Sequence, residues 1–288
     1  MPAHRDASVS VHVVRHDGGA IRPDRDSLVA EEPLEIRLRE EGGAAARFVV
    51  TMRTPGDDED LAAGLLFGEG VISGIGDVLA VGPPEEPGLA PDLARNVLVV
   101  TLAPGPARAI PRRATVMGSA CGVCGRTSIS DVLGLAESAR ARARNPAVAP
   151  AAGEVRIAAS LLTRLPDALR ERQSVFASTG GLHAAGFFEA DGALAVARED
   201  VGRHNATDKA IGSLLRARRP APPILLVSGR LGFEIAQKAA LAGVRIVAAV
   251  SAPTSLAVDL AEEAGITLVG FLRGGRFNVY AHPERIRE

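Results

Sequence analysis

The feature that most restricts the fold of this chain is an alternation of strand-like and helix-like segments near its C-terminus. Short apolar runs at 224–227, 244–250 and 266–272 have the length and aliphatic composition of strands. Stretches at about 232–242 and 254–264 have helical character. A strand–helix–strand–helix–strand order implies parallel strands joined by helical crossovers. The sequence therefore predicts an α/β fold with a parallel βαβαβ C-terminal half.

Polar side chains follow two of these predicted strands. Ser228 and Arg230 come after the first strand, and Ser251, Thr254 and Ser255 follow the second. Ligands of parallel sheets bind beyond the carboxyl ends of the strands. The second group also supplies hydroxyls that can cap the next helix beside free backbone N–H groups. We therefore expect an anion to bind at this edge of the sheet.

The first half of the chain is richer in strands. Alternating or apolar runs predict strands at 8–15, 34–38, 48–52, 77–81 and 96–102, and a helix that begins after a turn at 54–57. The stretch 138–153 is rich in Ala, Arg and Pro and lacks a period, which is typical of a connection between domains. We therefore divide the chain into a β-rich part, 1–137, and an α/β part, 153–288, which form two domains or one composite domain.

The β-rich part carries the only two cysteines, Cys121 and Cys124, as a CxxC pair flanked by glycines. This spacing suits disulfide redox chemistry, half of a zinc site, or the carrying of a sulfur atom. A net charge of −1 argues against general nucleic-acid binding. Because the sequence has neither a signal-peptide core nor an apolar run of about 18 residues, we expect a soluble cytoplasmic protein. In that reducing compartment a CxxC pair is more often catalytic, redox-active or metal-bound than structural.

A second concentration of polar side chains lies at 199–209, where a helix running to about 216 is predicted. A solvated helix start is one interpretation. The presence of Arg203, His204 and Asn205 together favours a functional use. Lys209 adds to this interpretation, because only two of the 33 Lys and Arg residues are lysine. The pKa of a lysine shifts on burial, whereas an arginine stays charged. Survival of this lysine by chance in an arginine-rich chain is the alternative.

His183 lies in the glycine-rich stretch 179–186, which we interpret as a turn. Its small residues would let a ligand approach the backbone closely. A structural role is the alternative for this histidine.

The segment FLRGGR near the C-terminus places two arginines on either side of two glycines. An edge hairpin is one interpretation. The other is bidentate recognition of a phosphate or a purine edge, which the planar guanidinium favours, and the position after a parallel strand supports it. The candidate residues are Phe271, Leu272, Arg273, Gly274, Gly275 and Arg276.

The histidines and cysteines do not match a zinc deaminase. Such a site needs a glutamate two residues after its histidine and a later CxxC pair. His183 is followed by two alanines, and the CxxC pair precedes it. A structural site of four cysteines would need two chains to share their pairs. We therefore expect no bound zinc.

Seven segments, in order, resemble the FdhD family of formate dehydrogenase accessory sulfurtransferases. They are TPGDDEDLAAGLLFGEGVI, CGVCGR, STGGLHAAG, EDVGRHNATDKAIG, SGRLGFEIAQKAALAGV, AVSAPTSLAV and GFLRGGRFNVY, and they extend over about 50–285. CGVCGR alone is a weak signal, whereas the ordered set is highly specific. The resemblance implies a cytidine-deaminase-like fold without zinc chemistry.

The resemblance also implies a sulfur carrier. Family members accept sulfane sulfur from a cysteine desulfurase as a cysteine persulfide. They pass it to the molybdenum cofactor, bis-molybdopterin guanine dinucleotide, before this cofactor enters formate dehydrogenase. By position, Cys121 would carry the persulfide and Cys124 would be its partner.

The expected partners are therefore a cysteine desulfurase, the catalytic subunit of formate dehydrogenase and the cofactor, without nucleic acid or membrane. Since the cofactor contains guanine nucleotides, GDP or GMP should mimic it. The candidate cofactor-binding residues are the 271–276 segment with His183, Arg203, His204, Asn205, Lys209, Arg230, Ser251, Thr254 and Ser255. A cofactor-binding chaperone that uses the CxxC pair only for docking or redox chemistry is the alternative, and a nucleoside-modifying zinc enzyme is a third class. A homodimer is compatible with the sequence, which does not determine the oligomeric state.

Overall fold

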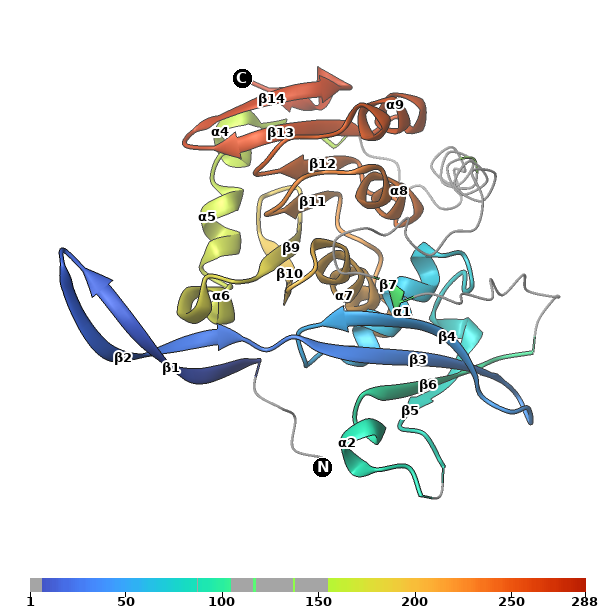
Figure 1. The fold of residues 1–288 in the computed structure, drawn as a ribbon. Helices are drawn as coiled ribbons and strands as arrows, with labels where there is room; N and C mark the ends of the chain where they lie inside the picture. The colour runs from blue at the N-terminus through green and yellow to red at the C-terminus, as the bar shows by residue number, and fades with distance from the viewer. Residues whose placement is uncertain (1–6, 87, 105–115, 118–136, 138–154) are drawn as a thin grey trace.

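The computed structural model of this protein describes residues 7–86, 88–104, 116–117, 137 and 155–288 (Figure 1). Its largest sheet has six strands in the order β10-β9-β11-β12-β13-β14. The strands β11 (Ile224–Val227), β12 (Ile246–Ala249) and β13 (Thr267–Arg273) are parallel. The helices α8 (Phe233–Leu241) and α9 (Ser255–Ala264) connect them. The predicted parallel βαβαβ unit is therefore confirmed.

Antiparallel strands complete this sheet on both sides. β9 (His183–Phe188) pairs with β11 and with β10 (Leu194–Asp200), while β14 (Arg276–Ala281) pairs with β13. The prediction of a turn throughout 179–186 is wrong from His183 onward, because β9 begins there. The small residues of this stretch allow close packing in the sheet, since a Cβ added at Gly186 would lie 2.8 Å from Leu169 Cδ1.

Helices cover both faces of the six-stranded sheet, and successive strand residues alternate between them. Leu225 and Val227 face the core formed with α7 (Arg203–Arg216), α8 and α9. Ile224 and Leu226 face a second core formed with α4 (Ala159–Leu162) and α5 (Leu165–Arg170). Figure 1 shows α5 and α6 (Ser174–Thr179) on the opposite side of the sheet from α8 and α9.

The N-terminal part forms a five-stranded sheet in the order β5-β6-β3-β4-β7. Four of its strands confirm those predicted within 34–102, and they are β3 (Glu32–Glu40), β4 (Ala46–Arg53), β5 (Val78–Gly82) and β6 (Val97–Leu102). The fifth, β7 (Val116–Met117), was not predicted. The predicted helix is α1 (Asp58–Gly68), whose first turn carries three acidic residues that interact favourably with the helix dipole.

The two sheets share one hydrophobic core, because α1 packs directly on α7. A Cβ added at Gly64 would lie 1.9 Å from Asp208 O, and one added at Gly212 would lie 1.8 Å from Asp60 O. The two helix backbones therefore touch at a crossing that only glycine permits. The core residues around it come from β3, β4, α1, α7 and α8.

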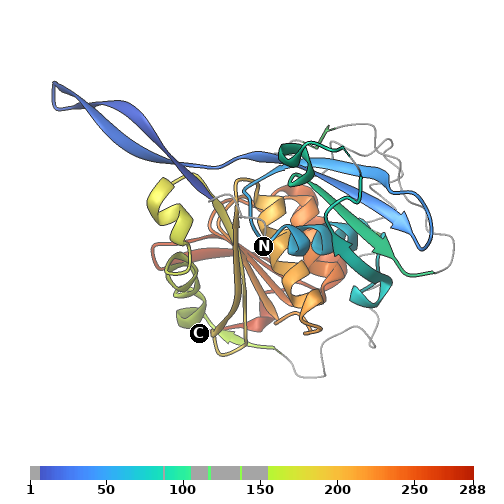
Figure 2. The same ribbon diagram turned by 90° about the horizontal axis from the view of Figure 1, so that it is seen from below.

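A long hairpin of β1 (Ser8–Asp17) and β2 (Ala20–Val29) extends away from the body, as Figures 1 and 2 show. β1 includes the strand predicted at 8–15, whereas the sequence analysis did not identify β2. The remaining short elements are η1 (Ile75–Asp77), α2 (Pro91–Ala94), β8 (Ile157–Ala158), η2 (Pro283–Arg285) and β15 (Ile286–Arg287). Within the described ranges, no helix has the length and apolarity needed to span a membrane.

Candidate functional site

A pocket of about 620 Å³ lies at the carboxyl ends of the parallel strands. One wall comes from Ser228 after β11, Val250 after β12 and Arg273 at the end of β13. The facing wall comes from α5, α6 and the residues that follow α6. This is the edge at which open α/β sheets bind ligands, and its volume is that of an ordinary small-molecule site.

His183 lines this pocket at the start of β9, opposite Asp200 in the β9–β10 pairing. Burial lowers the pKa of His183, and the positive charges of Arg203 and His204 lower it further, whereas Asp200 acts in the opposite direction. Gly229 allows this close packing, because a Cβ there would lie 3.2 Å from His183 Nδ1 and 3.4 Å from Arg203 Cδ. His183 is therefore mainly neutral at pH 7 and can accept or donate a hydrogen bond at the pocket wall.

The turn between β13 and β14 forms part of the pocket rim. Gly274 and Gly275 have φ angles of 58° and 73°, a left-handed pair that favours glycine at both positions. Phe271 also has a left-handed backbone, with φ of 54°, which is costly for a residue with a side chain. Its N–H donates to Ser251 O at 3.0 Å, which ties the end of β13 to the loop after β12. The structure thus holds an unfavourable conformation beside the pocket, a feature that concentrates at functional sites.

The two arginines of this turn have different positions. Arg273 lines the pocket, and its Cζ lies 5.8 Å from the centroid of the Phe271 ring. Arg276 pairs with Arg273 across the hairpin, is exposed, and is not among the lining residues. Leu272 is fully buried in the second core and anchors the turn. The hairpin and the ligand-binding interpretations of this segment are therefore compatible.

Of the polar residues predicted to bind a ligand after β11 and β12, Ser228 lines the pocket and the other four do not. Ser251, Thr254, Ser255 and Arg230 are absent from its described lining. Thr254 is the N-cap of α9, but the prediction of a hydroxyl cap is wrong there, because its side chain makes no capping hydrogen bond. Its backbone N–H instead donates to Leu231 O at 3.0 Å, which joins the two loops.

The polar segment at the start of α7 contributes mainly to the core. Lys209 is 1% exposed, and its Nζ lies 2.8 Å from Asp200 Oδ2 and donates to Thr54 O at 2.8 Å. Asn205 Nδ2 donates to Met52 O at 2.7 Å and to Asp200 Oδ1 at 3.1 Å. Both side chains connect α7 to the end of β4 and the residues after it, and neither lines the pocket.

The other lysine has a similar environment. Lys238 forms a buried ion pair with Asp208. Burial raises the pKa of Asp208, and the positive charge of Lys238 opposes that increase. Both lysines of the chain thus lie in buried ion pairs, where a compact ammonium on a flexible stem fits.

His204 has one ring nitrogen without a close partner. The residue is 6% exposed, and its Nε2 lies 3.7 Å from Glu234 Oε2, which is too long for a hydrogen bond. Among the residues that the structure describes, this Nε2 has no hydrogen-bond partner. The proximity of His204 nevertheless lowers the pKa of Glu234, so this carboxylate is ionised at neutral pH.

Four pocket residues were not identified from the sequence. Asp167, Arg170, Gln173 and Phe176 lie on or beside α5 and α6 and line the wall opposite the strand ends. The available signal was the helical spacing of Leu162, Leu165 and Leu169 with a proline in the first turn of α5, which predicts a helix but no ligand. No motif distinguished their polar neighbours.

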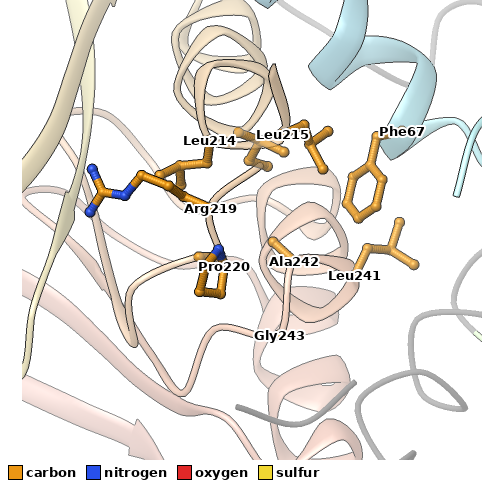
Figure 3. Close-up of a pocket in the computed structure, with 10 residues that line it drawn as sticks. Phe67, Leu214, Leu215, Arg219, Pro220, Leu241, Ala242 and Gly243 are labelled. Atoms are coloured by element: carbon orange, nitrogen blue, oxygen red, sulfur yellow. The ribbon is translucent and has the colours of Figure 1, made fainter. Parts of the chain in front are cut away.

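A smaller pocket, of about 190 Å³, lies between the ends of α1, α7 and α8 (Figure 3). Its lining residues are apolar or glycine, except for Arg219. In Figure 3 the Phe67 ring and the Leu241 side chain lie beside each other, while the guanidinium of Arg219 points away from them. None of the residues predicted to be functional lies in this pocket.

The predicted cysteine site, Cys121 and Cys124, lies outside the described residues. The nearest described strand before it is β7, which pairs with β4 at Val50 and Thr51. Within the part of the chain that the structure covers, no three His, Cys, Asp or Glu side chains gather as a metal site.

Comparison with known proteins identifies the same family as the ordered sequence motifs. The model of the FdhD/NarQ family matches residues 29–287. A solved structure with the same fold is that of a protein from Desulfotalea psychrophila assigned as a formate dehydrogenase accessory protein. It is 23% identical, with a TM-score of 0.70, and the match covers 98% of this chain and 100% of the other.

Relatives with similar sequences are named sulfur carrier protein FdhD. One from Anaeromyxobacter sp. (strain K) is 48% identical over 97% of this chain and 94% of its own length. One from Streptomyces coelicolor is 48% identical over 95% of this chain and 94% of its own length. One from Mycobacterium tuberculosis is 46% identical over 95% of this chain and 96% of its own length. With its family motifs in order and similarity along nearly its whole length, the chain belongs to the FdhD/NarQ family.

Proposed function

We propose that this protein carries sulfur as a persulfide on Cys121 and delivers it to bis-molybdopterin guanine dinucleotide, the molybdenum cofactor of formate dehydrogenase. The observation that carries this proposal is the 48% identity to relatives named as sulfur carriers, in a chain whose only cysteines form one CxxC pair. The donor would be a cysteine desulfurase, and the acceptor protein would be the catalytic subunit of formate dehydrogenase in the cytoplasm.

Persulfide chemistry gives each cysteine a distinct role. In loading, the Cys121 thiolate attacks the outer sulfur of the desulfurase persulfide, the old S–S bond breaks, and the desulfurase cysteine leaves as a thiolate. In release, the Cys124 thiolate attacks Cys121 Sγ, and the outer sulfur leaves as sulfide for the cofactor. The two electrons come from the Cys124 thiolate, and a Cys121–Cys124 disulfide remains for a cellular thiol to reduce.

The pocket supports the cofactor part of the proposal. The Arg273 guanidinium and the turn at Gly274 and Gly275 offer a cation and an open backbone to a pyrophosphate. His183 adds a neutral ring on the neighbouring strand. The pocket is large enough for one nucleotide half of the cofactor, so GDP and GMP are the natural mimics.

Intact-mass measurement tests the sulfur step. After incubation with a desulfurase and cysteine, the wild-type protein should gain sulfur that a reductant removes. Cys121→Ala should abolish this gain, whereas Cys124→Ala should still load and then release sulfide slowly. Normal loading of Cys121→Ala would contradict the assignment.

Calorimetric titration with GDP tests the nucleotide step. Arg273→Ala should weaken binding about ten- to hundredfold, because it removes charge-assisted hydrogen bonds to phosphate. Arg276→Ala is a matched control on the same turn, and its smaller effect should reflect its position outside the lining. Equal affinities for the wild type and Arg273→Ala would remove the turn from the site.

A cofactor-binding chaperone is the second candidate, and the pocket is the observation that favours it, because nucleotide binding there does not require sulfur chemistry. It predicts intact GDP binding and loss of formate dehydrogenase activity in both Cys→Ala variants, with no persulfide ever detected on the wild type. The cytidine-deaminase-like fold and the absence of bound zinc belong to the same proposal, and a homodimer is compatible with it.

A further inference from the structure

His204, in the first turn of α7, is a buried histidine whose ring lacks a close partner. The residue is 6% exposed, and its Nε2 makes no hydrogen bond to any residue that the structure describes. Buried polar atoms are normally hydrogen-bonded, so this nitrogen is an exception. His204 was predicted to bind the cofactor, yet it is not among the described lining residues of the pocket at the strand ends. Its ring is therefore free for chemistry that nucleotide binding does not use.

A carboxylate lies beside this ring. Glu234, the second residue of α8, places its Oε2 3.7 Å from His204 Nε2, and the two side chains are 17% and 8% exposed. The proximity of His204 lowers the pKa of Glu234, although the partial burial of this carboxyl acts in the opposite direction. Glu234 is therefore ionised at neutral pH, and its negative charge stabilises a ring that takes up a proton. A histidine that a third group orients is a common base for activating a cysteine.

The other charges near His204 leave this pairing intact. The groups that act on the ring or on its neighbours are Arg203 and Asp208 of α7, Lys238 of α8, His183 of β9 and Glu69 after α1. Asp208 and Lys238 form a buried ion pair and neutralise each other. Arg203 and His183 approach one another at Gly229, toward the pocket. Among the described residues, Glu234 is thus the acid that comes closest to the ring.

The start of α7 lies beside the strand that precedes the cysteines. Asn205, the neighbour of His204, accepts a hydrogen bond from Thr51 Oγ1 at 3.4 Å and donates to Met52 O at 2.7 Å. Thr51 is in turn the partner of Met117 in the pairing of β4 with β7. Because these two strands are parallel, they run toward the same end of the sheet. β7 therefore ends on the side where α7 begins.

The chain between Met117 and Cys121 is short, and its length limits the distance between them. Cys121 itself lies outside the described residues, but it follows Met117 by four residues, which extend over at most about 14 Å. Neighbouring strands lie about 4.8 Å apart, and Thr51 already contacts the residue next to His204. Cys121 can therefore reach the His204 ring, whereas Cys124, seven residues after Met117, has a looser tether.

Sulfur loading requires a base at this place. A free cysteine has a pKa of about 8.5, so only a few per cent of its thiol is ionised at neutral pH, and the thiolate is the form that attacks. A neighbouring group that takes the proton and then carries a positive charge increases that fraction. His204 with Glu234 supplies such a group, buried and without another close partner among the described residues.

We propose that His204, oriented by Glu234, removes the proton from the Cys121 thiol when this cysteine accepts sulfur. The Cys121 thiolate then bonds to the outer sulfur of the desulfurase persulfide, the old S–S bond breaks, and its electron pair leaves on the desulfurase cysteine. The proton that His204 holds passes to that departing thiolate, which returns the ring to its neutral form. Glu234 acts through His204 as a positioning residue. This inference rests on the sulfur-carrier part of the proposed function and assigns His204 to the cysteine instead of the cofactor.

The pH dependence of cysteine alkylation tests this assignment. In a Cys124→Ala background Cys121 is the only cysteine, and intact mass follows its reaction with iodoacetamide across the pH range of thiol ionisation. We expect the midpoint of the profile below about pH 7.5 with His204 present, and about one unit higher or more in His204→Gln, near the 8.5 of a free cysteine. The rate at high pH should change by about threefold or less, because the thiol ionises there without a base. An unchanged midpoint in His204→Gln, with or without a lower rate at high pH, would overturn the proposal.

Glu234→Gln tests the pairing without deleting the ring. The amide keeps the size of the carboxyl and lacks its charge, so the midpoint should rise by a smaller amount than in His204→Gln. This variant keeps the test decisive if His204→Gln fails to fold, since Glu234 is only partly buried. His16→Gln is the matched control, because His16 is exposed on the β1–β2 hairpin, and it should leave the profile unchanged. An unshifted midpoint in Glu234→Gln would contradict the pairing on which the proposal depends.

Persulfide loading by a desulfurase, measured on the same preparations, keeps this inference separate from the function it rests on. The rate of loading of His204→Gln should fall at neutral pH and approach that of the unchanged protein at high pH. If the alkylation midpoint shifts as expected but the wild type never acquires sulfur, the carrier function fails and the base assignment stands. If the wild type acquires sulfur and His204→Gln keeps the same midpoint, the base assignment fails and the carrier function stands.

Discussion

Replacement of Lys209 by methionine should lower the free energy of unfolding, because Lys209 lies in the core. Its Nζ is 2.8 Å from the carboxylate of Asp200, and the two residues are 1% and 0% exposed. Removing one partner of a buried ion pair typically costs about 3–5 kcal/mol, since the other charge stays uncompensated. Asp200 keeps hydrogen bonds from Thr54 N, Gly202 N and Asn205 Nδ2. We therefore expect the lower end, a loss of about 3 kcal/mol in the free energy of unfolding.

Lys209→Arg separates charge from shape at the same site. The guanidinium keeps the positive charge, but it is larger and forked, and the site has no room for it at 1% exposure. Overpacking of this kind costs about 1–3 kcal/mol. Any loss of formate dehydrogenase activity in this variant should therefore follow the loss of folded protein.

Urea denaturation followed by circular dichroism measures these differences, and the slope of each transition shows whether unfolding stays two-state. Arg219→Met is a control for the loss of an exposed pair, because Arg219 lies 3.6 Å from Glu189 with half its side chain exposed. It should change stability by about 0.5 kcal/mol or less. A loss below about 1 kcal/mol in Lys209→Met, similar to this control, would refute the structural role of the ion pair.

Three further predictions concern the crossing of α1 and α7, the pocket histidine and metal content. Gly212→Ala should lower the free energy of unfolding by about 1–3 kcal/mol or more, because its Cβ would lie 1.8 Å from Asp60 O. Gly76→Ala is the control, since a Cβ there meets open space and should leave stability unchanged. Urea denaturation of the two variants makes the comparison. The pKa of His183 is lower in the folded state than in the unfolded state, where it is near 6.5. The contribution of His183 to stability is therefore complete above the unfolded-state pKa and is lost as the pH falls through the folded-state pKa. The melting temperature of the wild type should therefore fall more steeply between pH 7 and pH 5 than that of His183→Gln, and parallel curves would contradict this. Elemental analysis should find no stoichiometric zinc in the purified protein, and about one zinc per chain would revive the enzyme alternative.

The elements that could be predicted from the sequence are those whose pattern is local. The strand at 224–227 is a continuous apolar run because both of its faces are buried, and the helices after it have clear starts. β9 and β10 were not predicted, because the glycine and alanines of β9 indicate a turn locally and become a strand only by pairing with β11. The short helices α4–α6 depend on tertiary packing in the same way.

The candidate site shows a similar division. The glycine spacing around Arg273 and the presence of His183 marked the pocket from the sequence, because unusual backbone and rare side chains leave local signals. Lys209 also stood out, yet its rarity reflects a buried ion pair. Rarity in composition does not distinguish a ligand contact from a core contact. Gln173 left no signal, because its place in the pocket wall results only from tertiary packing.

The helix α7 connects the pocket to the end of β4. Its first residue, Arg203, packs against the glycine that adjoins His183 in the pocket. Two and six residues later, Asn205 and Lys209 donate hydrogen bonds to the backbone oxygens of Met52 and Thr54, at the end of β4 and just after it. β4 pairs in turn with β7, the last described strand before the cysteines. Variants that loosen α7, such as Lys209→Met, should therefore reduce nucleotide binding and sulfur loading together, whereas Arg273→Ala, in the pocket lining, should affect nucleotide binding alone.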